Sequence, residues 1–96
     1  MNKNVPSNNL LLNLGFDQFN EMQIAAQEAI LEENNVLLLS PTGSGKTVAF
    51  LVPIFEMLQP EIQSVQCLII VPSRELGLQI EQVWKKMGTN YKVYIC

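Results

Sequence analysis

A loop of eight residues, Ser40-Pro41-Thr42-Gly43-Ser44-Gly45-Lys46-Thr47, carries the residue types that bind phosphate. Gly43 and Gly45 let the backbone curl, so that successive main-chain N–H groups can point into one concavity. Lys46 would reach the outer phosphates of a nucleotide, and the hydroxyl of Thr47 would hold Mg²⁺. The usual pattern, G-x-x-x-x-G-K-[ST], has glycine where this chain has Ser40, but the cradling amides come from residues 43–47. We predict a nucleotide-binding loop with Lys46 and Thr47 as its catalytic groups.

The segments on either side of the loop have the order that such a loop needs. Val36–Leu39 is apolar throughout, as is typical of a strand in a parallel sheet covered on both faces. Residues 46–58 predict a helix, whose unpaired amides and positive dipole end would face the same anion. The alternative is a glycine-containing turn from strand to helix with an incidental lysine. The strand and helix together favour nucleotide binding.

The rest of the chain alternates helices and strands. Helical spacing and capping residues predict helices over residues 21–33 and 74–87, and a short one through residues 10–14 that Gly15 ends. Apolar runs predict further strands at residues 67–71 and 91–96. This alternation predicts an α/β domain with three parallel strands and flanking helices, with nucleotide at the carboxyl edge of the sheet. We assign residues 1–9 to a flexible lead-in and residues 10–96 to a partial domain.

Composition excludes several kinds of site. The chain has 96 residues, a net charge of −3 and no histidine, so His metal ligands and Ser-His or Cys-His pairs are absent from it. Cys67 and Cys96 fall in predicted strands and suggest buried thiols in a reducing compartment. No run approaches the ~18 apolar residues of a membrane helix. We expect a soluble, cytoplasmic protein with no membrane partner.

Three segments in this order resemble motifs of the first RecA-like domain of DEAD-box RNA helicases. The Q motif of that family, roughly Gly-Phe-x-x-Pro-Thr-x-Ile-Gln, stands here as Gly15-Phe16-Asp17-Gln18-Phe19-Asn20-Glu21-Met22-Gln23. Motif I, usually Ala-x-Thr-Gly-Ser-Gly-Lys-Thr, stands as residues 40–47. Motif Ia, Pro-Thr-Arg-Glu-Leu-Ala, stands as Pro72-Ser73-Arg74-Glu75-Leu76-Gly77. The resemblance spans most of the chain and implies a truncated RecA-like P-loop NTPase domain.

The resemblance implies roles for the residues that match the motifs. It makes Gln23 the reader of adenine, Phe16 the ring that stacks on adenine, and Thr42 to Thr47 the holders of ATP and Mg²⁺. For Gln23 the alternative is a capping box, because Asn20-x-x-Gln23 has that spacing. For Phe16 the alternative is a core aromatic beside Leu14. Phe19-Asn20 replaces the Pro-Thr of the family, so this chain lacks the threonine hydroxyl at that position.

The resemblance also implies that Pro72, Ser73 and Arg74 contact the phosphates of an RNA strand. A helix N-terminus with a capping hydroxyl and an arginine is a suitable anion site. The alternative is an ordinary helix cap followed by a surface arginine. RNA held through its phosphates would be bound with little sequence preference.

Groups needed for hydrolysis are missing from the chain. Phosphoryl transfer to water needs Mg²⁺ held from two sides and a group that orients the water, which the family takes from its Asp-Glu-Ala-Asp motif. Asp17 is the only aspartate here, and no Asp-Glu pair occurs. We therefore expect the N-terminal part of an ATP-dependent RNA helicase, which binds nucleotide weakly and does not hydrolyse it. The full protein would couple hydrolysis to RNA duplex unwinding.

Two other functions fit the same loop. One is an unrelated P-loop NTPase or kinase, which would be indifferent to RNA. The other is a non-catalytic, nucleotide-gated interaction module, which would bind ATP or ADP through Lys46 without turnover. The resemblance further implies that later strands separate the strands of motifs I and Ia. Without them, we expect open sheet edges through which the chain self-associates.

Overall fold

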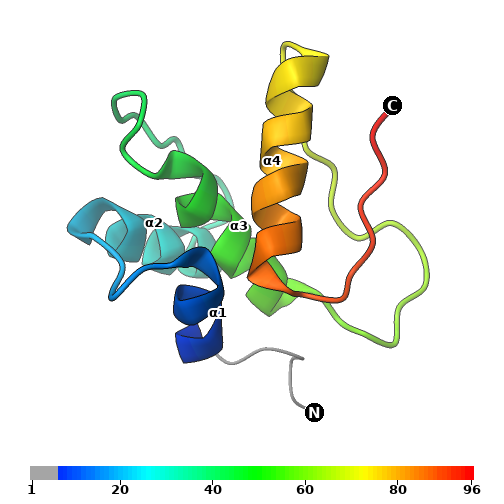
Figure 1. Ribbon diagram of the computed structural model, residues 1–96, viewed down its shortest axis with the longest axis horizontal. Helices are drawn as coiled ribbons and strands as arrows, with labels where there is room; N and C mark the ends of the chain where they lie inside the picture. The colour runs from blue at the N-terminus through cyan, green and yellow to red at the C-terminus, as the bar shows by residue number, and fades with distance from the viewer. Residues whose placement is uncertain (1–6) are drawn as a thin grey trace.

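Four α-helices form the regular structure of the computed structural model, which describes residues 7–96 (Figure 1). They are α1 (Ser7–Leu14), α2 (Glu21–Glu32), α3 (Lys46–Met57) and α4 (Arg74–Met87). The helices predicted at residues 21–33, 46–58 and 74–87 are confirmed, with ends that agree to within one residue. The predicted lead-in over residues 1–9 lies mostly outside the described residues, and α1 begins at Ser7.

The ends of α4 follow from its sequence. At its N-terminus the Ser73 hydroxyl accepts a hydrogen bond of 3.2 Å from the main-chain N–H of Leu76, which satisfies one of the free amides of the first turn. At its C-terminus Gly88 adopts a left-handed φ of 70°, which costs glycine nothing. Lys85 and Lys86 lie in the last turn, where the helix dipole favours positive charge. The capping hydroxyl predicted at the start of this helix is confirmed.

The end of α1 is a Schellman motif, which fixes how the chain turns toward α2. Gly15 has φ 81°, and its N–H donates to the carbonyl of Leu12 at 3.1 Å. The N–H of Phe16 reaches further back, to the carbonyl of Leu11 at 2.9 Å. These are the two bonds that define the motif. The backbone that leads into Phe16, including its own N–H, is therefore held before α2 begins.

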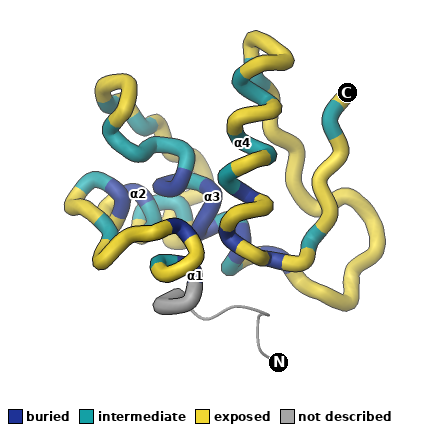
Figure 2. The backbone as a smooth tube through the Cα atoms, viewed as in Figure 1, coloured by how far each residue is buried: buried dark blue, intermediate teal, exposed yellow. Residues whose placement is uncertain are grey.

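The core lies around α3, which is apolar on most of its surface and is packed by α2 and α4, while α1 packs against α4. Figure 2 shows the buried residues gathered on α3 and on the turns that face it. The main cluster consists of Leu10, Leu14, Val48, Leu51, Val52, Phe55, Leu58, Trp84 and Met87. Burial of such side chains contributes roughly 1.5–3 kcal/mol each. The stability of the described chain therefore depends on helix packing around α3.

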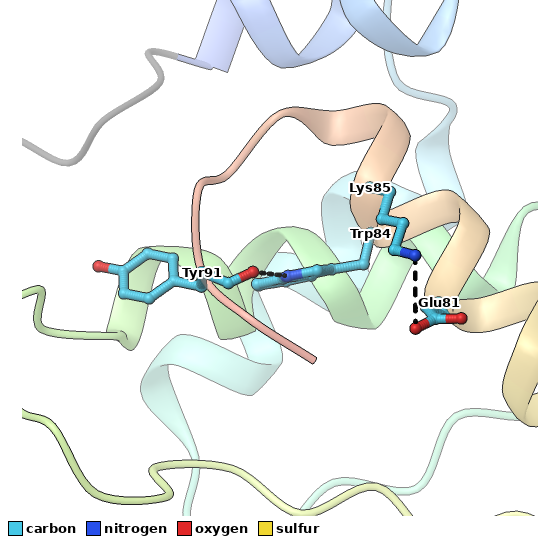
Figure 3. Close-up of polar contacts among 4 residues, drawn as sticks. All are labelled: Glu81, Trp84, Lys85 and Tyr91. Carbon is cyan, nitrogen blue, oxygen red and sulfur yellow. Dashed lines mark hydrogen bonds and ion pairs between the residues drawn. The ribbon is translucent and has the colours of Figure 1, made fainter. Parts of the chain in front are cut away.

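Three aromatic rings extend this core toward the C-terminus. Phe55 meets Trp84 and Tyr91 edge to face, with ring centroids 6.4 Å and 6.1 Å apart. The indole N–H of Trp84 donates to the main-chain carbonyl of Tyr91 at 3.2 Å, which ties the C-terminal segment to α4 (Figure 3). Burial raises the pKa of the Tyr91 hydroxyl, and the negative charge of Glu61 raises it further. The ring cluster thus places residues after α4 against the core.

The α/β prediction is wrong for residues 7–96, because this part of the chain contains four helices and no strand. The segments predicted as strands, at residues 36–39, 67–71 and 91–96, form no backbone–backbone hydrogen bond with any other described segment. Their side chains are not buried between layers either: Leu37 and Leu39 are each 82% exposed and Ile70 is 84% exposed. An apolar run becomes a strand only beside a partner that completes its hydrogen bonds, and no described segment takes that place.

Two further expectations depended on the sheet and fail with it. Cys67 and Cys96, predicted to be buried in strands, are free cysteines at the surface. The predicted self-association requires open sheet edges, and residues 7–96 contain no sheet. None of the helices between residues 7 and 96 is long and apolar enough to cross a membrane.

Candidate phosphate-binding site

The loop before α3 turns sharply at its two glycines. Gly43 has φ 83° and Gly45 has φ 93°, a region that residues with side chains rarely occupy. Between them, the N–H of Ser44 donates to the carbonyl of Pro41 at 3.3 Å. Gly45 is the N-cap of α3, so the helix begins at Lys46 directly after the turn. The sequence thus forms the turn into a helix that the motif predicts.

The main-chain N–H groups at the start of α3 have no hydrogen-bond partner among residues 7–96. Gly45 has no side chain to cap the helix, and the first bond that closes it runs from Ala49 N–H to the Gly45 carbonyl at 3.1 Å. Within the described residues, the N–H groups of residues 45–48 donate no hydrogen bond. Unpaired donors and the positive end of the helix dipole together form a site for an anion.

Ser40, which stands where the usual pattern has glycine, braces the loop. Its hydroxyl lies 2.7 Å from the hydroxyl of Ser44. The Ser44 hydroxyl also donates to the carbonyl of Pro41 at 2.6 Å. A glycine at position 40 could make no such bond. The sequence shows that Ser40 departs from the usual pattern, but it does not predict that the Ser40 hydroxyl contacts Ser44.

Lys46 and Thr47 occupy the first turn of α3 and are both partly exposed. Among residues 7–96 the one ion pair joins Lys85 and Glu81, at 3.6 Å (Figure 3), so the ammonium of Lys46 has no carboxylate partner there. The Thr47 hydroxyl makes no hydrogen bond with the described chain. Both polar groups are thus available to a ligand.

Asn20 and Gln23 form a capping box at the N-terminus of α2. The N–H of Gln23 donates to Asn20 Oδ1 at 2.8 Å, and the N–H of Asn20 donates to Gln23 Oε1 at 2.9 Å. The capping alternative for Gln23 is therefore confirmed. Gln23 is 3% exposed, so its carboxamide lies inside the molecule and not on its surface.

The same two side chains also reach across to the loop. Gln23 Nε2 donates to the carbonyl of Gly45 at 3.2 Å, and Asn20 Nδ2 donates to the carbonyl of Ser44 at 3.1 Å. The approach is close: a Cβ on Gly45 would collide with Gln23 Nε2. The sequence showed the box but not these bonds, because they join residues 22 and 24 positions apart.

The other predicted residues lie on separate elements. Phe16 is 38% exposed in the turn between α1 and α2 and lies outside the core cluster, so it is not the core aromatic of the alternative interpretation. Pro72, Ser73 and Arg74 are exposed at the N-terminus of α4, where Ser73 caps the helix. Arg74 has no ion-pair partner among residues 7–96. No described bond joins either group to the loop.

A hollow of about 420 Å³ lies at the other end of α4, beside the C-terminal segment. Trp84, Lys85, Thr89, Tyr91 and Tyr94 are among the residues that line it. None of the residues predicted to bind nucleotide or RNA lines this hollow. The candidate site is therefore the turn at the start of α3 together with the α2 cap that contacts it.

Comparison with known families decides what kind of protein carries this turn. The model of the DEAD/DEAH box helicase family matches residues 20–96, from the α2 cap to the end of the chain. The chain belongs to the DEAD/DEAH box helicase family. The match includes the phosphate-binding loop and the start of α4, while Phe16 lies before it. The family resemblance found in the motifs is thereby confirmed.

Relatives of the chain carry helicase names. It is 36% identical over 81 residues to the ATP-dependent RNA helicase DHH1 of Gibberella zeae, an alignment that covers 84% of this chain and 16% of that protein. It is 40% identical over 79 residues to the DEAD-box ATP-dependent RNA helicase CshC of Bacillus cereus, with 82% of this chain and 20% of that protein covered. The chain thus spans a fifth or less of these DEAD-box relatives. A comparison with solved structures finds no match.

Proposed function

We propose that this chain is the ATP-binding portion of a DEAD-box RNA helicase and holds the phosphates of ATP in the turn that opens α3. The observation that carries the proposal is the row of N–H groups at residues 45–48 that have no partner among the described residues and belong to the same turn as Lys46 and Thr47. Family membership and the names of the relatives support ATP as the ligand. In the full-length protein, the same turn would serve hydrolysis coupled to the unwinding of RNA duplexes.

Different residues would bind different parts of the nucleotide. Main-chain amides of residues 43 and 45–47 would donate to the phosphate oxygens, while the Ser44 N–H is held by the Pro41 carbonyl, and the two left-handed glycines keep that surface free of side chains. The ammonium of Lys46 would neutralise the outer phosphates as a point charge. Phe16, exposed in the neighbouring turn, would stack on the adenine ring. Thr42 and Ser44 would complete the wall of the loop.

Gln23 keeps part of its hydrogen-bonding capacity for adenine. A carboxamide offers two N–H groups and two lone pairs. In Gln23 the N–H of Asn20 occupies one lone pair, and the bond to the Gly45 carbonyl uses one N–H. We propose that the remaining N–H and lone pair bind the edge of the base. Because Gln23 is 3% exposed, its side chain must turn outward for the edge of the base to reach the amide.

The chain can supply a ligand to Mg²⁺ from one side, through Thr47. The Thr47 hydroxyl, in the first turn of α3, makes no hydrogen bond with residues 7–96 and is an oxygen ligand of the kind Mg²⁺ takes, together with phosphate oxygens and water. No group of three acidic, Cys or His side chains that could hold a metal occurs among residues 7–96. When bound, Mg²⁺ would neutralise charge on the phosphates. We propose that residues 1–96 bind ATP–Mg²⁺ without hydrolysing it, because they contain no Asp-Glu pair.

Thr47→Ala is expected to reduce the gain in ADP affinity that Mg²⁺ provides. The substitution removes the only protein oxygen that we assign to the metal, a contact of the order of 1–3 kcal/mol, or about 5- to 100-fold in affinity. Titration calorimetry of ADP with Mg²⁺ and with EDTA measures this gain in each variant.

Thr47→Ser is the matched control, because it keeps the hydroxyl and removes only a methyl group. It should retain the Mg²⁺ effect. Equal Mg²⁺ dependence in Thr47→Ala and in the unchanged protein would contradict the metal role. Failure of the unchanged protein to bind ADP at all would contradict the proposed function itself.

Arg74→Ala is expected to weaken RNA binding by the full-length protein by about 3- to 10-fold, whatever the RNA sequence. Arg74 is exposed at the N-terminus of α4 beside the Ser73 cap, and we propose that it contacts phosphate there. Loss of one phosphate contact should lower the salt slope of the affinity by about one. Fluorescence anisotropy with U-rich and A-rich single strands at several salt concentrations measures both quantities.

Lys86→Ala is the control for charge alone, because Lys86 lies in the last turn of the same helix. It should change RNA affinity less than Arg74→Ala does. An Arg74 effect confined to one RNA sequence would argue against a phosphate contact.

A further inference from the structure

We propose that Asn20 is a positioning residue of the phosphate-binding turn, which aims the main-chain N–H of Gly45 at the ligand. The inference rests on the proposed nucleotide-binding function and adds a residue to it. Asn20 belongs to the cap of α2 and is not itself part of the loop. Its carboxamide performs two tasks at once, since Oδ1 accepts from Gln23 N–H at 2.8 Å while Nδ2 donates to the Ser44 carbonyl at 3.1 Å.

The contact to Ser44 matters because of peptide planarity. The carbonyl of Ser44 and the N–H of Gly45 belong to one planar trans peptide unit and point in opposite directions. A bond that holds the carbonyl toward α2 therefore turns the Gly45 N–H away from α2. Gln23 does the same for the next unit, because it holds the Gly45 carbonyl at 3.2 Å and so turns the N–H of Lys46. Both of these N–H groups are without a partner in the described chain.

The residue type at position 20 suits this double task. In an asparagine the donor and the acceptor are different atoms at the end of the side chain. A serine or threonine has one oxygen, closer to the backbone, and uses it to cap the helix. Asn20 can therefore cap α2 and reach the loop carbonyl at the same time. Without Nδ2, the Ser44–Gly45 peptide would lose its only described bond to α2.

Two substitutions separate the two tasks. Asn20→Ser is neutral and keeps a cap acceptor, but it removes the donor to Ser44. Asn20→Asp keeps the shape and the cap, and places an oxygen against the Ser44 carbonyl. Gln18→Glu adds the same negative charge as Asn20→Asp at an exposed neighbouring position that makes no described bond to the loop.

We expect both Asn20 variants to loosen the turn while α2 stays folded. In the ADP-free chain, ¹⁵N relaxation should show the order parameters of the Gly45 and Lys46 amides falling from about 0.85 toward 0.6, with those inside α2 unchanged. The dissociation constant for ADP should rise by about 3- to 10-fold, as expected for one lost hydrogen bond. Gln18→Glu should leave the order parameters unchanged.

The order parameters decide the inference whether or not ADP binds. If they are unchanged in Asn20→Ser, Asn20 does not position the turn and the inference is overturned. It is also overturned if the order parameters fall while the affinity for ADP stays the same. A further contrary result would be that Gln18→Glu weakens ADP binding as much as Asn20→Asp does, while Asn20→Ser leaves ADP binding unchanged. If the unchanged chain fails to bind ADP, the proposed function is lost, and the order parameters still report whether Asn20 holds the loop.

Discussion

Replacement of Lys46 by alanine is expected to weaken ADP binding by about 10- to 100-fold, because the substitution removes the only side-chain charge in the turn. A hydrogen bond to a charged group contributes roughly 1.5–3 kcal/mol, which sets this range. Lys46 has no ion-pair partner among residues 7–96, so its loss leaves no carboxylate unpaired. The first turn of α3 should therefore stay folded. Titration calorimetry with ADP–Mg²⁺ measures the loss, and circular dichroism measures the fold.

Lys86→Ala is the matched control for this prediction also. It changes the net charge by the same amount, but at the far end of α4. Its dissociation constant for ADP should stay within about twofold of the unchanged protein, as expected of a distant charge screened by salt. If Lys46→Ala retained the full affinity, Lys46 would not contact phosphate, and the assignment of the turn as a nucleotide site would fail.

Gly45→Ala is expected to disrupt the turn more severely than any other single methyl group added to the loop. Gly45 has φ 93°, a conformation in which a residue with a Cβ is strained by roughly 1–2 kcal/mol. The new Cβ would also collide with Gln23 Nε2, so the α2 cap must shift as well. We expect ADP affinity to fall by about tenfold or more and thermal stability to fall with it.

Gly43→Ala separates strain from collision. Gly43 has a similar φ of 83°, but a Cβ there would meet nothing within 4 Å. Its effect should be the strain alone and therefore smaller. Equal effects of Gly43→Ala and Gly45→Ala on unfolding temperature and ADP affinity would show that the collision with Gln23 Nε2 contributes no measurable free energy.

The helices were predictable because local residues determine them. Ser73, Gly88 and Gly15 mark helix ends through bonds to backbone groups a few positions away, and those bonds are present. The same holds for the box of Asn20 and Gln23, whose two bonds join residues three apart. Such interactions depend on sequence spacing alone, which the chain displays directly.

The strands were not predictable in this way. Val36–Leu39 and residues 67–71 have the apolar content of buried strands, but a strand also needs hydrogen-bonding neighbours, which lie elsewhere in sequence and in space. Here the helices around α3 form the core, and the two apolar segments stay outside it. The pattern showed a preference for burial and could not show whether a partner was present.

The candidate site was predictable in its loop but not in its supports. Glycines, lysine and threonine at motif spacing located the turn, since their chemistry is local. The bond from Asn20 to the Ser44 carbonyl and the brace between Ser40 and Ser44 depended on how the loop folds back. The first joins two elements, so no spacing rule could reveal it.

The turn is anchored on one flank only. Asn20 and Gln23 fasten it to α2, whereas residues 35–39, which lead into it, make no hydrogen bond with the described chain. A ligand that binds in the turn must also order some of residues 35–39, at an entropic cost of roughly 1–2 kcal/mol for each residue ordered. That cost subtracts from the intrinsic affinity. Anything that stiffened residues 35–39 beforehand would therefore tighten nucleotide binding without touching the nucleotide.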